Sequence, residues 1–423
     1  MSSSSLADRR DNVFGVGAPL FYKEPLHIVR GEGVTLYDEA GKQYIDMYNN
    51  VPCVGHANPH VVEAMHKQAS TLNVHSRYLH EGVVEFAERL VAKHRSPDLS
   101  RVVFSCTGSE ANEVAIKMAR LATGGKGLIC TDRAYHGNTD LVGTLTYAGM
   151  REQTNVRPVV FPQKYRPIEE GLSEEALADR YVVEVERAIE SFKDAGVPLA
   201  AMLVCSVCAN EGVPDIPKGY MKRAADLVRA AGGVMISDEV QAGYCRTGDW
   251  WGYETSDFVP DIVTTGKPMG NGVPLSATVT SKEIADTFRK KSRYFNTFAS
   301  SPLQAAAGSA VLNVIESEGL LGQVDDVGEH LRNELKKFEH PSIGDVRGPG
   351  LFVGIDWVLN RDIKEPDAEG AAEMANRLKD KGFLINHAGA HSNILKLRPP
   401  LVFTRDHADQ FLAAFAETLE DIS

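Results

Sequence analysis

The sequence lacks the long apolar runs that membrane-spanning chains carry. No segment approaches the roughly 18 consecutive apolar residues of a spanning helix, and the longest candidate, residues 199–208, has the length of a strand. The first ten residues are polar and contain no apolar leader, so we expect a frayed terminus there and no signal peptide. A membrane anchor is therefore not expected.

Cysteine and basic charge are also in short supply. The six cysteines show no disulfide framework, so we expect free thiols in a reducing compartment, the cytoplasm. Cys205 and Cys208 form a CxxC without a second pair or a suitably spaced histidine, so no metal site is expected. The 57 acidic residues exceed the 45 basic ones, for a net charge of −12. This balance argues against nucleic acid or an anionic membrane as the main partner, although a local cationic pocket could still bind a small anion.

The composition is that of an ordinary globular chain of two or more domains. The chain has 423 residues, of which 43% are apolar and 24% are charged. In its central part, short apolar runs alternate with amphipathic stretches such as 109–122 and 219–231. The expected strands are 101–104, 127–130, 200–207, 233–237, 261–265 and 276–280. This alternation predicts an α/β fold with a mostly parallel central sheet and helices on both faces.

The two flanks predict a smaller α+β unit. Residues 28–47 alternate around a turn at 39–41, which indicates antiparallel strands. After residue 318 a helix, three strands and a final amphipathic helix follow. We therefore expect residues 1–55 to join the small domain, residues 56–315 to form the large domain, and residues 316–423 to complete the small one.

Three sites at strand ends carry the chemistry. The segment SCTGSEANE, residues 105–113, follows a strand and opens a helix, whose first N–H groups can hold a phosphate. Asp238 ends an apolar strand, and Lys267 lies in a Gly/Pro-rich turn after the next one. Each feature alone has an ordinary explanation: a buried helix start, an N-cap, or a solvated lysine. Ligands of open α/β sheets bind at strand ends, and a phosphate cradle, a carboxylate and an amine together suit pyridoxal phosphate.

The whole chain resembles the class-III, or omega, pyridoxal-phosphate-dependent aminotransferases, which have the type I fold of such enzymes. The matching motifs, in order, are FSCTGSEANE, AYHG, ISDEVQAGYCRTG, DIVTTGKPMGNG and YFNTFASSPLQAAAG. The resemblance implies that Lys267 forms the Schiff base with the cofactor and that Asp238 pairs with its ring nitrogen. The other implied cofactor residues are Tyr135 and Val240 on the two ring faces, His136 beside Tyr135, Gln241 at the ring hydroxyl, and Gly108, Ser109 and a partner subunit's Thr297 at the phosphate. Lys267, Asp238 and Tyr135 would be the catalytic residues, and Thr297 implies a homodimer with shared sites.

Within the family, the sequence is most similar to the phospho-lyases of ethanolamine phosphate and phosphohydroxylysine. The resembling segments are 48–56, 73–80, 267–272 and 394–400. Most family members carry a glutamate at the strand end where this chain has Cys205, and an aminotransferase would need that glutamate more than a lyase. We therefore expect a lyase that converts ethanolamine phosphate to acetaldehyde, ammonia and phosphate. The alternative is an omega-aminotransferase that passes an amine to pyruvate or another 2-oxo acid.

A lyase must also bind the substrate phosphate. Arg77, Arg398 and Lys23 are the candidates, in that order, because cationic donors suit a dianion. For each, a solvated surface charge is the ordinary alternative, and the family arginine that matches Arg398 can equally hold a substrate carboxylate. Asn50 and Tyr22 are further candidates for the pocket wall. A cofactor-binding relative without turnover is a third hypothesis, against which Lys267, Asp238 and Tyr135 argue.

Overall fold

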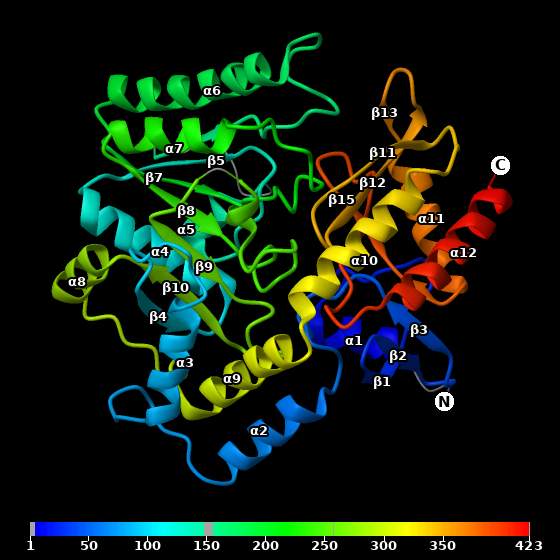
Figure 1. Cartoon of the computed structure of the whole chain (residues 1–423), viewed down its shortest axis with the longest axis horizontal. Coiled ribbons are helices and arrows are strands. Elements are labelled where there is room, and N and C mark those ends of the chain that lie inside the picture. Colours follow the sequence, from blue (N-terminus) through cyan, green and yellow to red (C-terminus); the bar gives the residue numbers. More distant parts are fainter. Residues whose placement is uncertain (1–4, 148–154, 257, 423) are drawn as a thin grey trace.

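A computed structural model of the chain describes residues 5–147, 155–256 and 258–422. Two parts are visible in Figure 1: a large part around a central sheet and a small part that contains both ends of the chain. Within the described ranges, no helix is both long and apolar enough to cross a bilayer.

The large part is built on a sheet of seven strands. Their order across the sheet is β4 (Arg101–Ser105), β10 (Ser276–Thr280), β9 (Ile262–Thr265), β8 (Val234–Asp238), β7 (Leu199–Val204), β5 (Gly127–Thr131) and β6 (Val156–Val159). Only β10 runs antiparallel to its neighbours. The carboxyl ends of β5, β7, β8 and β9 therefore meet at one edge, as the strand–helix alternation predicts.

Helices cover both faces of this sheet. They are α4 (Gly108–Thr123) with α8 (Lys282–Lys291) on one face, and α6 (Glu174–Asp194) with α7 (Tyr220–Ala230) on the other. Successive strand residues alternate between the two cores, so Leu203 contacts the α4 side while Met202 and Val204 contact the α6 side. The predicted α/β class with helices on both faces is confirmed.

The small part combines the two ends of the chain. One of its sheets has the order β1 (Ile28–Glu32), β2 (Thr35–Asp38), β3 (Gln43–Asp46) and β14 (Phe383–Leu384). The other contains β11 (Ile343–Arg347), β12 (Val353–Asn360), β16 (Ile394–Leu397) and β15 (Asn386–Ala388), with β13 (Glu365–Pro366) beside β12. The pairing of β3 with β14 joins the N-terminal strands to the C-terminal segment. The domain boundaries themselves stay a prediction.

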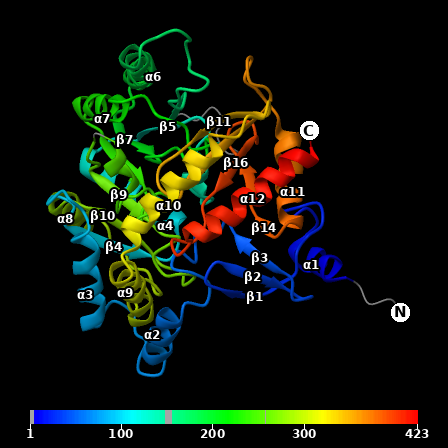
Figure 2. The ribbon, with the colours of Figure 1, turned by 45° about the vertical axis from the view of Figure 1, so that its right-hand side comes forward.

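The remaining helices frame these two parts. They are α1 (Leu6–Phe14), α2 (Pro59–Ala69), α3 (Glu81–Val91), the short α5 (Asp140–Gly143), α9 (Pro302–Ser317), α10 (Leu320–Leu335), α11 (Ala368–Asp380) and α12 (Arg405–Asp421), with the 3-10 turn η2 (Gly252–Thr255). In Figure 2, α11 and α12 lie on the side of the small part, above the β1–β3 strands.

The structure corrects three expectations of local structure. The polar start is helical from Leu6, because the Ser5 side chain and Asp8 form a capping box, although α1 buries no side chain. Residues 28–47 form three strands, since the chain also turns at Gly33. Strand β7 ends at Val204, and the chain then turns, with a positive φ of 45° at Cys208. The segment after β7 is therefore a loop at the edge of the sheet.

A buried histidine makes the stability of the large part depend on pH. The His94 ring stacks on Trp251 at 4.3 Å between centroids, and its Nδ1 lies 3.1 Å from the Tyr253 hydroxyl. Burial lowers the pKa of His94 to about 3, whereas the unfolded chain binds this proton near pH 6.5. Folding stability from this site is therefore lost as the pH falls below about 6.5.

We expect His94→Asn to weaken this pH dependence, because asparagine keeps a hydrogen-bonding group near Tyr253 but does not titrate. Between pH 6.5 and 4.5 the variant should lose about 2 kcal/mol less unfolding free energy than the wild type, as measured by urea unfolding. The exposed His66 provides the control His66→Asn, which should leave the slope unchanged. Equal slopes in wild type and His94→Asn would contradict this explanation.

Candidate active site

A cavity of about 320 Å³ opens at the edge where the parallel strands end. The wall contains every sequence-predicted cofactor residue except Thr297: Gly108, Ser109, Tyr135, His136, Asp238, Val240, Gln241 and Lys267. They come from the start of α4, the turn after β5, the end of β8 and the turn after β9. The fold thus brings together motifs that are up to 159 residues apart, from Gly108 to Lys267, because neighbouring parallel strands end at the same edge.

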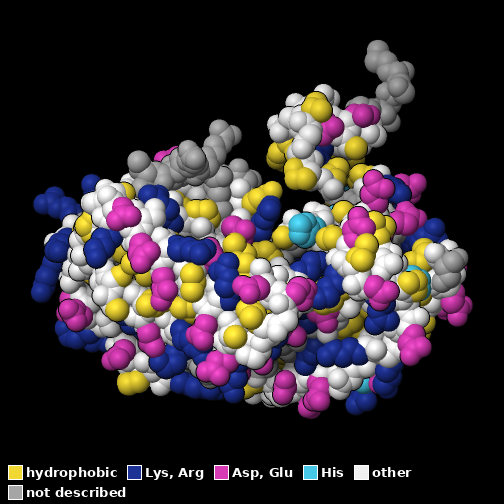
Figure 3. Space-filling view, turned by 90° about the horizontal axis from the view of Figure 1, so that it is seen from above, with side chains coloured by type: hydrophobic (Ala, Val, Ile, Leu, Met, Phe, Trp, Pro, Cys, Tyr) yellow, Lys and Arg dark blue, Asp and Glu magenta, His cyan; other side chains and the backbone are white. Residues whose placement is uncertain are grey.

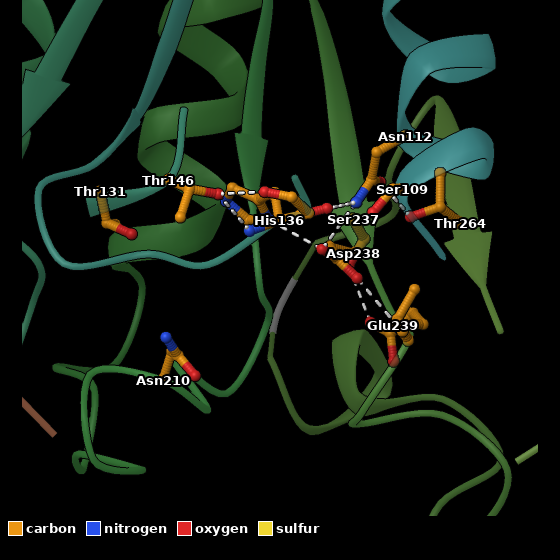
Figure 4. A network of polar contacts seen from close by, with 12 residues as sticks. Ser109, Asn112, Thr131, His136, Thr146, Asn210, Ser237, Asp238, Glu239 and Thr264 are labelled. Carbon is orange, nitrogen blue, oxygen red and sulfur yellow. Dashed lines mark hydrogen bonds and ion pairs between the residues drawn. The ribbon is translucent and has the colours of Figure 1, made fainter. Parts of the chain in front are cut away.

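Asp238 is the buried anchor of this edge. Its Oδ2 accepts a hydrogen bond from Asn112 Nδ2 at 3.0 Å and lies 2.8 Å from His136 Nδ1, while its Oδ1 accepts from the Val240 N–H at 3.0 Å. Asn112 in turn accepts from the Thr264 hydroxyl at 2.7 Å. Figure 4 shows Asp238 between His136 on one side and Asn112 on the other. The carboxylate is thereby fixed in orientation while only 5% of the residue is exposed.

The start of α4 forms a cradle with little room for side chains. A Cβ at Gly108 would lie 2.9 Å from the Val240 methyl groups, and one at Gly137 would lie 2.4 Å from Ser109 Oγ. The predicted capping box of Thr107 and Glu110 is present, which orders the first turn of α4. The free N–H groups and the Ser109 hydroxyl therefore face the cavity at the positive end of a 16-residue helix.

Lys267 supplies a buried amine. Burial lowers its pKa, and the nearby guanidinium of Arg398 lowers it further, whereas the charge of Asp238 acts in the opposite direction. Cys205 also lines the cavity, and burial raises the pKa of its thiol, which keeps it uncharged. The arrangement favours an amine that is more easily deprotonated, and therefore more nucleophilic, than an exposed lysine.

Arg398 lies behind the cavity wall. Its guanidinium donates a hydrogen bond to Gln241 Oε1 and stacks over the Tyr48 ring, with its central carbon 4.2 Å from the ring centroid. Its Nε has no hydrogen-bond partner, and within the described ranges it forms no salt bridge. A cation without a salt bridge in the described ranges is thus held against a cavity residue, although the Asp46 carboxylate acts on it electrostatically.

The other sequence-predicted residues lie outside the cavity wall of a single chain. Arg77 is exposed and stacks over Phe295 at 4.1 Å, and Thr297 is exposed nearby. Lys23 is paired with Glu373 at 2.7 Å, and the Tyr22 hydroxyl donates to the Ile385 carbonyl at 2.8 Å. Asn50 is buried, and its Nδ2 has no partner.

Two cavity residues, Asn210 and Glu211, were not predicted from the sequence. They follow the turn after β7, and Glu211 is only 3% exposed. Burial raises the pKa of the Glu211 carboxyl. The signal in the sequence is a carboxylate that follows a parallel strand. The predicted strand, 200–207, ran past the actual end of β7 at Val204, so Glu211 was not recognised as a residue of the loop at the sheet edge.

The residues at this edge fit pyridoxal phosphate. The glycine cradle and Ser109 match a phosphate group, the fixed Asp238 carboxylate matches a protonated ring nitrogen, and the Lys267 amine matches an aldehyde. Val240 and the exposed ring of Tyr135 line the space between these polar groups. Within the described ranges, no cluster of three or more His, Cys, Asp or Glu residues could hold a metal ion.

Comparison with known proteins identifies the family. The model of the class-III aminotransferases matches residues 21–419. The chain belongs to the class-III aminotransferase family. It is 37% identical to the alanine–glyoxylate aminotransferase 2-like protein of Drosophila melanogaster, over 99% of this chain and 87% of that protein. It is 36% identical to the ethanolamine-phosphate phospho-lyase homolog 1 of Caenorhabditis elegans, over 99% of this chain and 94% of that protein.

Solved structures of family members agree with the fold. A phospholyase from Arthrobacter in complex with phosphoethanolamine shares 41% identity and a TM-score of 0.95, covering 99% of this chain and 100% of that one. The omega transaminase of Pseudomonas jessenii in complex with PMP shares 28% identity and a TM-score of 0.89, covering 99% and 98%. The chain is therefore a pyridoxal-phosphate-dependent enzyme with the type I fold.

The buried amine generates a prediction for the cofactor-free protein. We expect Lys267→Met to abolish turnover and to raise the unfolding free energy at pH 7, because the folded state no longer carries an amine whose charged form is disfavoured by burial. A lowered pKa means that folding stability from Lys267 is recovered as the pH rises, so the difference should shrink towards pH 10. Urea unfolding at several pH values measures it.

The control for this experiment is Lys126→Met, at an exposed lysine. It should change the unfolding free energy by less than about 0.5 kcal/mol at any pH. A difference between wild type and Lys267→Met that does not vary with pH would contradict the assignment of a perturbed amine to this position.

Proposed function

We propose that the enzyme is a phospho-lyase that eliminates phosphate from ethanolamine phosphate. The observation that carries the proposal is the match, at 41% identity and a TM-score of 0.95, to a phospholyase in complex with phosphoethanolamine. The name of the Caenorhabditis elegans relative, an ethanolamine-phosphate phospho-lyase homolog, points the same way.

The charges around the cavity support a dianionic substrate. Arg398 is buried and Lys267 is half-buried, and the nearest strand end carries the uncharged thiol of Cys205. Burial lowers the pKa of both cations, so an anion beside them gains more than it would next to fully solvated side chains. A phosphate ester would therefore find Arg398 without a competing carboxylate salt bridge. Arg77 and Lys23 stay candidates for further phosphate contacts, and Asn50 and Tyr22 for the pocket wall.

Six residues of the cavity wall have tasks in the proposed reaction. When bound, pyridoxal phosphate supplies an electron sink for the carbon that bears the substrate nitrogen. Lys267 Nζ takes the proton from this carbon, which its lowered pKa favours. Asp238 would hold a proton on the ring nitrogen through its fixed carboxylate, and the Tyr135 and Val240 side chains would line the ring. Gly108 and Ser109 would hold the cofactor phosphate.

The overall reaction balances with one water molecule. The carbon–oxygen bond to the phosphate breaks, and the phosphate leaves with the electron pair of that bond. Water then replaces the nitrogen on the adjacent carbon, so that acetaldehyde, ammonia and inorganic phosphate are the products. No 2-oxo acid is consumed, which separates this reaction from amino-group transfer.

The second candidate is an omega-aminotransferase that uses pyruvate or another 2-oxo acid. It is favoured by the names of relatives, including the 37% identical alanine–glyoxylate aminotransferase 2-like protein. Arg398 would suit a substrate carboxylate as well as a phosphate. The two candidates differ in whether an oxo acid is required.

We also propose that two copies of the chain form a dimer with shared active sites. Large apolar side chains are exposed on neighbouring surface segments: Leu72, Tyr78, Leu79, Phe295 and Phe298. Thr297 lies among them, and α1 adds Val13 and Phe14 without burying any side chain of its own. Figure 3 shows hydrophobic side chains on the projecting N-terminal segment that contains α1. Apolar surface of this kind is typical of a subunit interface.

We also propose that the protein is located in a reducing compartment, the cytoplasm. All six of its cysteines are free thiols.

We expect the cofactor-loaded protein to release phosphate from ethanolamine phosphate with no oxo acid present, together with equal amounts of acetaldehyde and ammonia over many turnovers. A phosphate assay and an aldehyde assay measure this, and Lys267→Ala is the control that should release none. Absence of phosphate, with alanine formed once an amine and pyruvate are supplied, would establish the aminotransferase instead.

A hybrid dimer tests the shared site. We expect Thr297→Asp to inactivate the homodimer, because the added carboxylate would repel the cofactor phosphate of the other subunit. A purified hybrid of a Thr297→Asp chain with a Lys267→Ala chain contains one intact site, so it should regain about half of the wild-type activity. A hybrid as inactive as both parents, or a fully active Thr297→Asp homodimer, would contradict the arrangement.

A further inference from the structure

The side-chain amide of Gln241 lies between a buried cation and the cavity. Its Oε1 accepts a hydrogen bond from the guanidinium of Arg398, and the residue forms part of the cavity wall. Its Nε2 forms no hydrogen bond within the described ranges and, unlike the Nε of Arg398, is not fully enclosed. One end of the amide is therefore bonded, while the other is available to a ligand in the cavity.

The cation determines which end of the amide is available. A guanidinium carries only N–H donors, so it can bond the oxygen of a side-chain amide but not its NH2 group. With Oε1 on Arg398, Gln241 presents two N–H donors to the cavity. The reversed amide would place donors against donors beside the charge. Without such a neighbour, nothing in the amide itself decides between the two orientations.

The segment that follows β3 holds Arg398 in this place. The backbone N–H of Arg398 donates to the Met47 carbonyl at 2.8 Å, and its guanidinium carbon lies 4.2 Å from the centroid of the Tyr48 ring. The ring of Phe21 packs edge-on against that of Tyr48, with 5.3 Å between centroids. A guanidinium stacked on a ring keeps its in-plane N–H groups free to donate, here to Gln241.

Asp46 orders the backbone that carries Tyr48. Its carboxylate is fully buried, and Oδ1 accepts hydrogen bonds from the N–H groups of Tyr48 at 3.0 Å and Asn49 at 2.9 Å. Its Oδ2 lies 2.7 Å from His56 Nε2. These contacts fix the chain at Tyr48 and therefore the ring against which Arg398 stacks. A continuous series of contacts thus runs from the small part of the molecule to the cavity wall.

We propose that Arg398, held by Tyr48, is a positioning residue that orients the Gln241 amide so that its N–H group donates to the ring oxygen of the cofactor. Arg398 acts through Gln241, from behind the cavity wall. A guanidinium has five N–H donors, so others remain for a substrate anion. The inference rests on pyridoxal phosphate as the cofactor, and it holds for a lyase and an aminotransferase alike.

The visible absorbance of the cofactor-loaded protein tests this orientation without any substrate. The titrating proton of the lysine-bound cofactor is stabilised by the ionised ring oxygen, so a donor to that oxygen lowers the midpoint of the absorbance change with pH. We expect Gln241→Ala to raise the midpoint by about one pH unit, because the donor is lost. Tyr48→Leu should raise it by about half a unit, because a guanidinium without its ring no longer fixes the amide.

A double-mutant cycle separates orientation from direct charge effects. In the Gln241→Ala background no amide remains to be oriented, so Tyr48→Leu should shift the midpoint by less than about 0.2 unit. Arg398→Met is the second probe, for use where Tyr48→Leu does not fold. It also removes a charge, so it should shift the midpoint in both backgrounds, but by about half a unit more when Gln241 is present. The charged and titratable groups that interact with Arg398 are the same in both backgrounds: Asp46, Tyr48, Arg246, Lys267 and Lys396.

Lys396→Met is the matched control, at a buried lysine whose Nζ donates to the Ala209 carbonyl at 2.5 Å and not to Gln241. Its effect on the midpoint should be equal in the two backgrounds. Equal shifts from Tyr48→Leu, or from Arg398→Met in its place, with and without Gln241 would overturn the proposal. So would a midpoint that Gln241→Ala leaves unchanged, or a Lys396→Met shift that depends on Gln241 as strongly.

Discussion

A carboxylate that is almost completely removed from water must be held by donors, and the bonds to Asp238 are the constraint on which the active site depends. One donor comes from α4, one group from the turn after β5, and one N–H from the residues that follow β8. These elements can supply the three groups only if the strands β5, β7 and β8 end at one edge of the sheet. The same register brings the cradle of α4 and the turn of Lys267 to the cavity. The order of the strands therefore determines the position of each functional group.

The second determinant is the group of cations beside the cavity. Arg398 lowers the pKa of Lys267, and Arg398 and Lys267 both lower the pKa of the buried Lys396. Such a site gains from each anion it receives, first the cofactor phosphate and then an anionic substrate. This balance makes the difference between a phosphate and a carboxylate substrate a matter of a few contacts around Arg398.

The cofactor residues and most central strands could be predicted from the sequence, because the functional motifs follow directly after apolar strands. Parallel strands end at a common edge, so Gly108, Asp238 and Lys267 could be assigned to one site before any coordinates were considered. The boundaries of most central strands also followed from apolar runs. Strand β7 was predicted too long, because Cys205 to Val207 are buried and apolar enough to continue a strand, whereas the left-handed residue Cys208 turns the chain.

Contacts between distant segments could not be predicted in this way. The ion pair of Lys23 with Glu373 joins residues 350 positions apart, and no local pattern marks it. The same holds for Arg398, whose partner Gln241 belongs to another part of the molecule. Glu211 lacks a motif of its own and reaches the cavity only because the chain turns after β7. Thr297 and Arg77 lie on the surface of the single chain, and no contact within it marks them as site residues.

The account depends most directly on the claim that Asp238 holds a proton on the ring nitrogen of the cofactor. Nitrogen NMR of the protein loaded with pyridoxal phosphate labelled with 15N at that position measures the proton directly. The account predicts a protonated ring nitrogen at neutral pH in the wild type and an unprotonated one in Asp238→Asn. The same protonated signal in both proteins would contradict it.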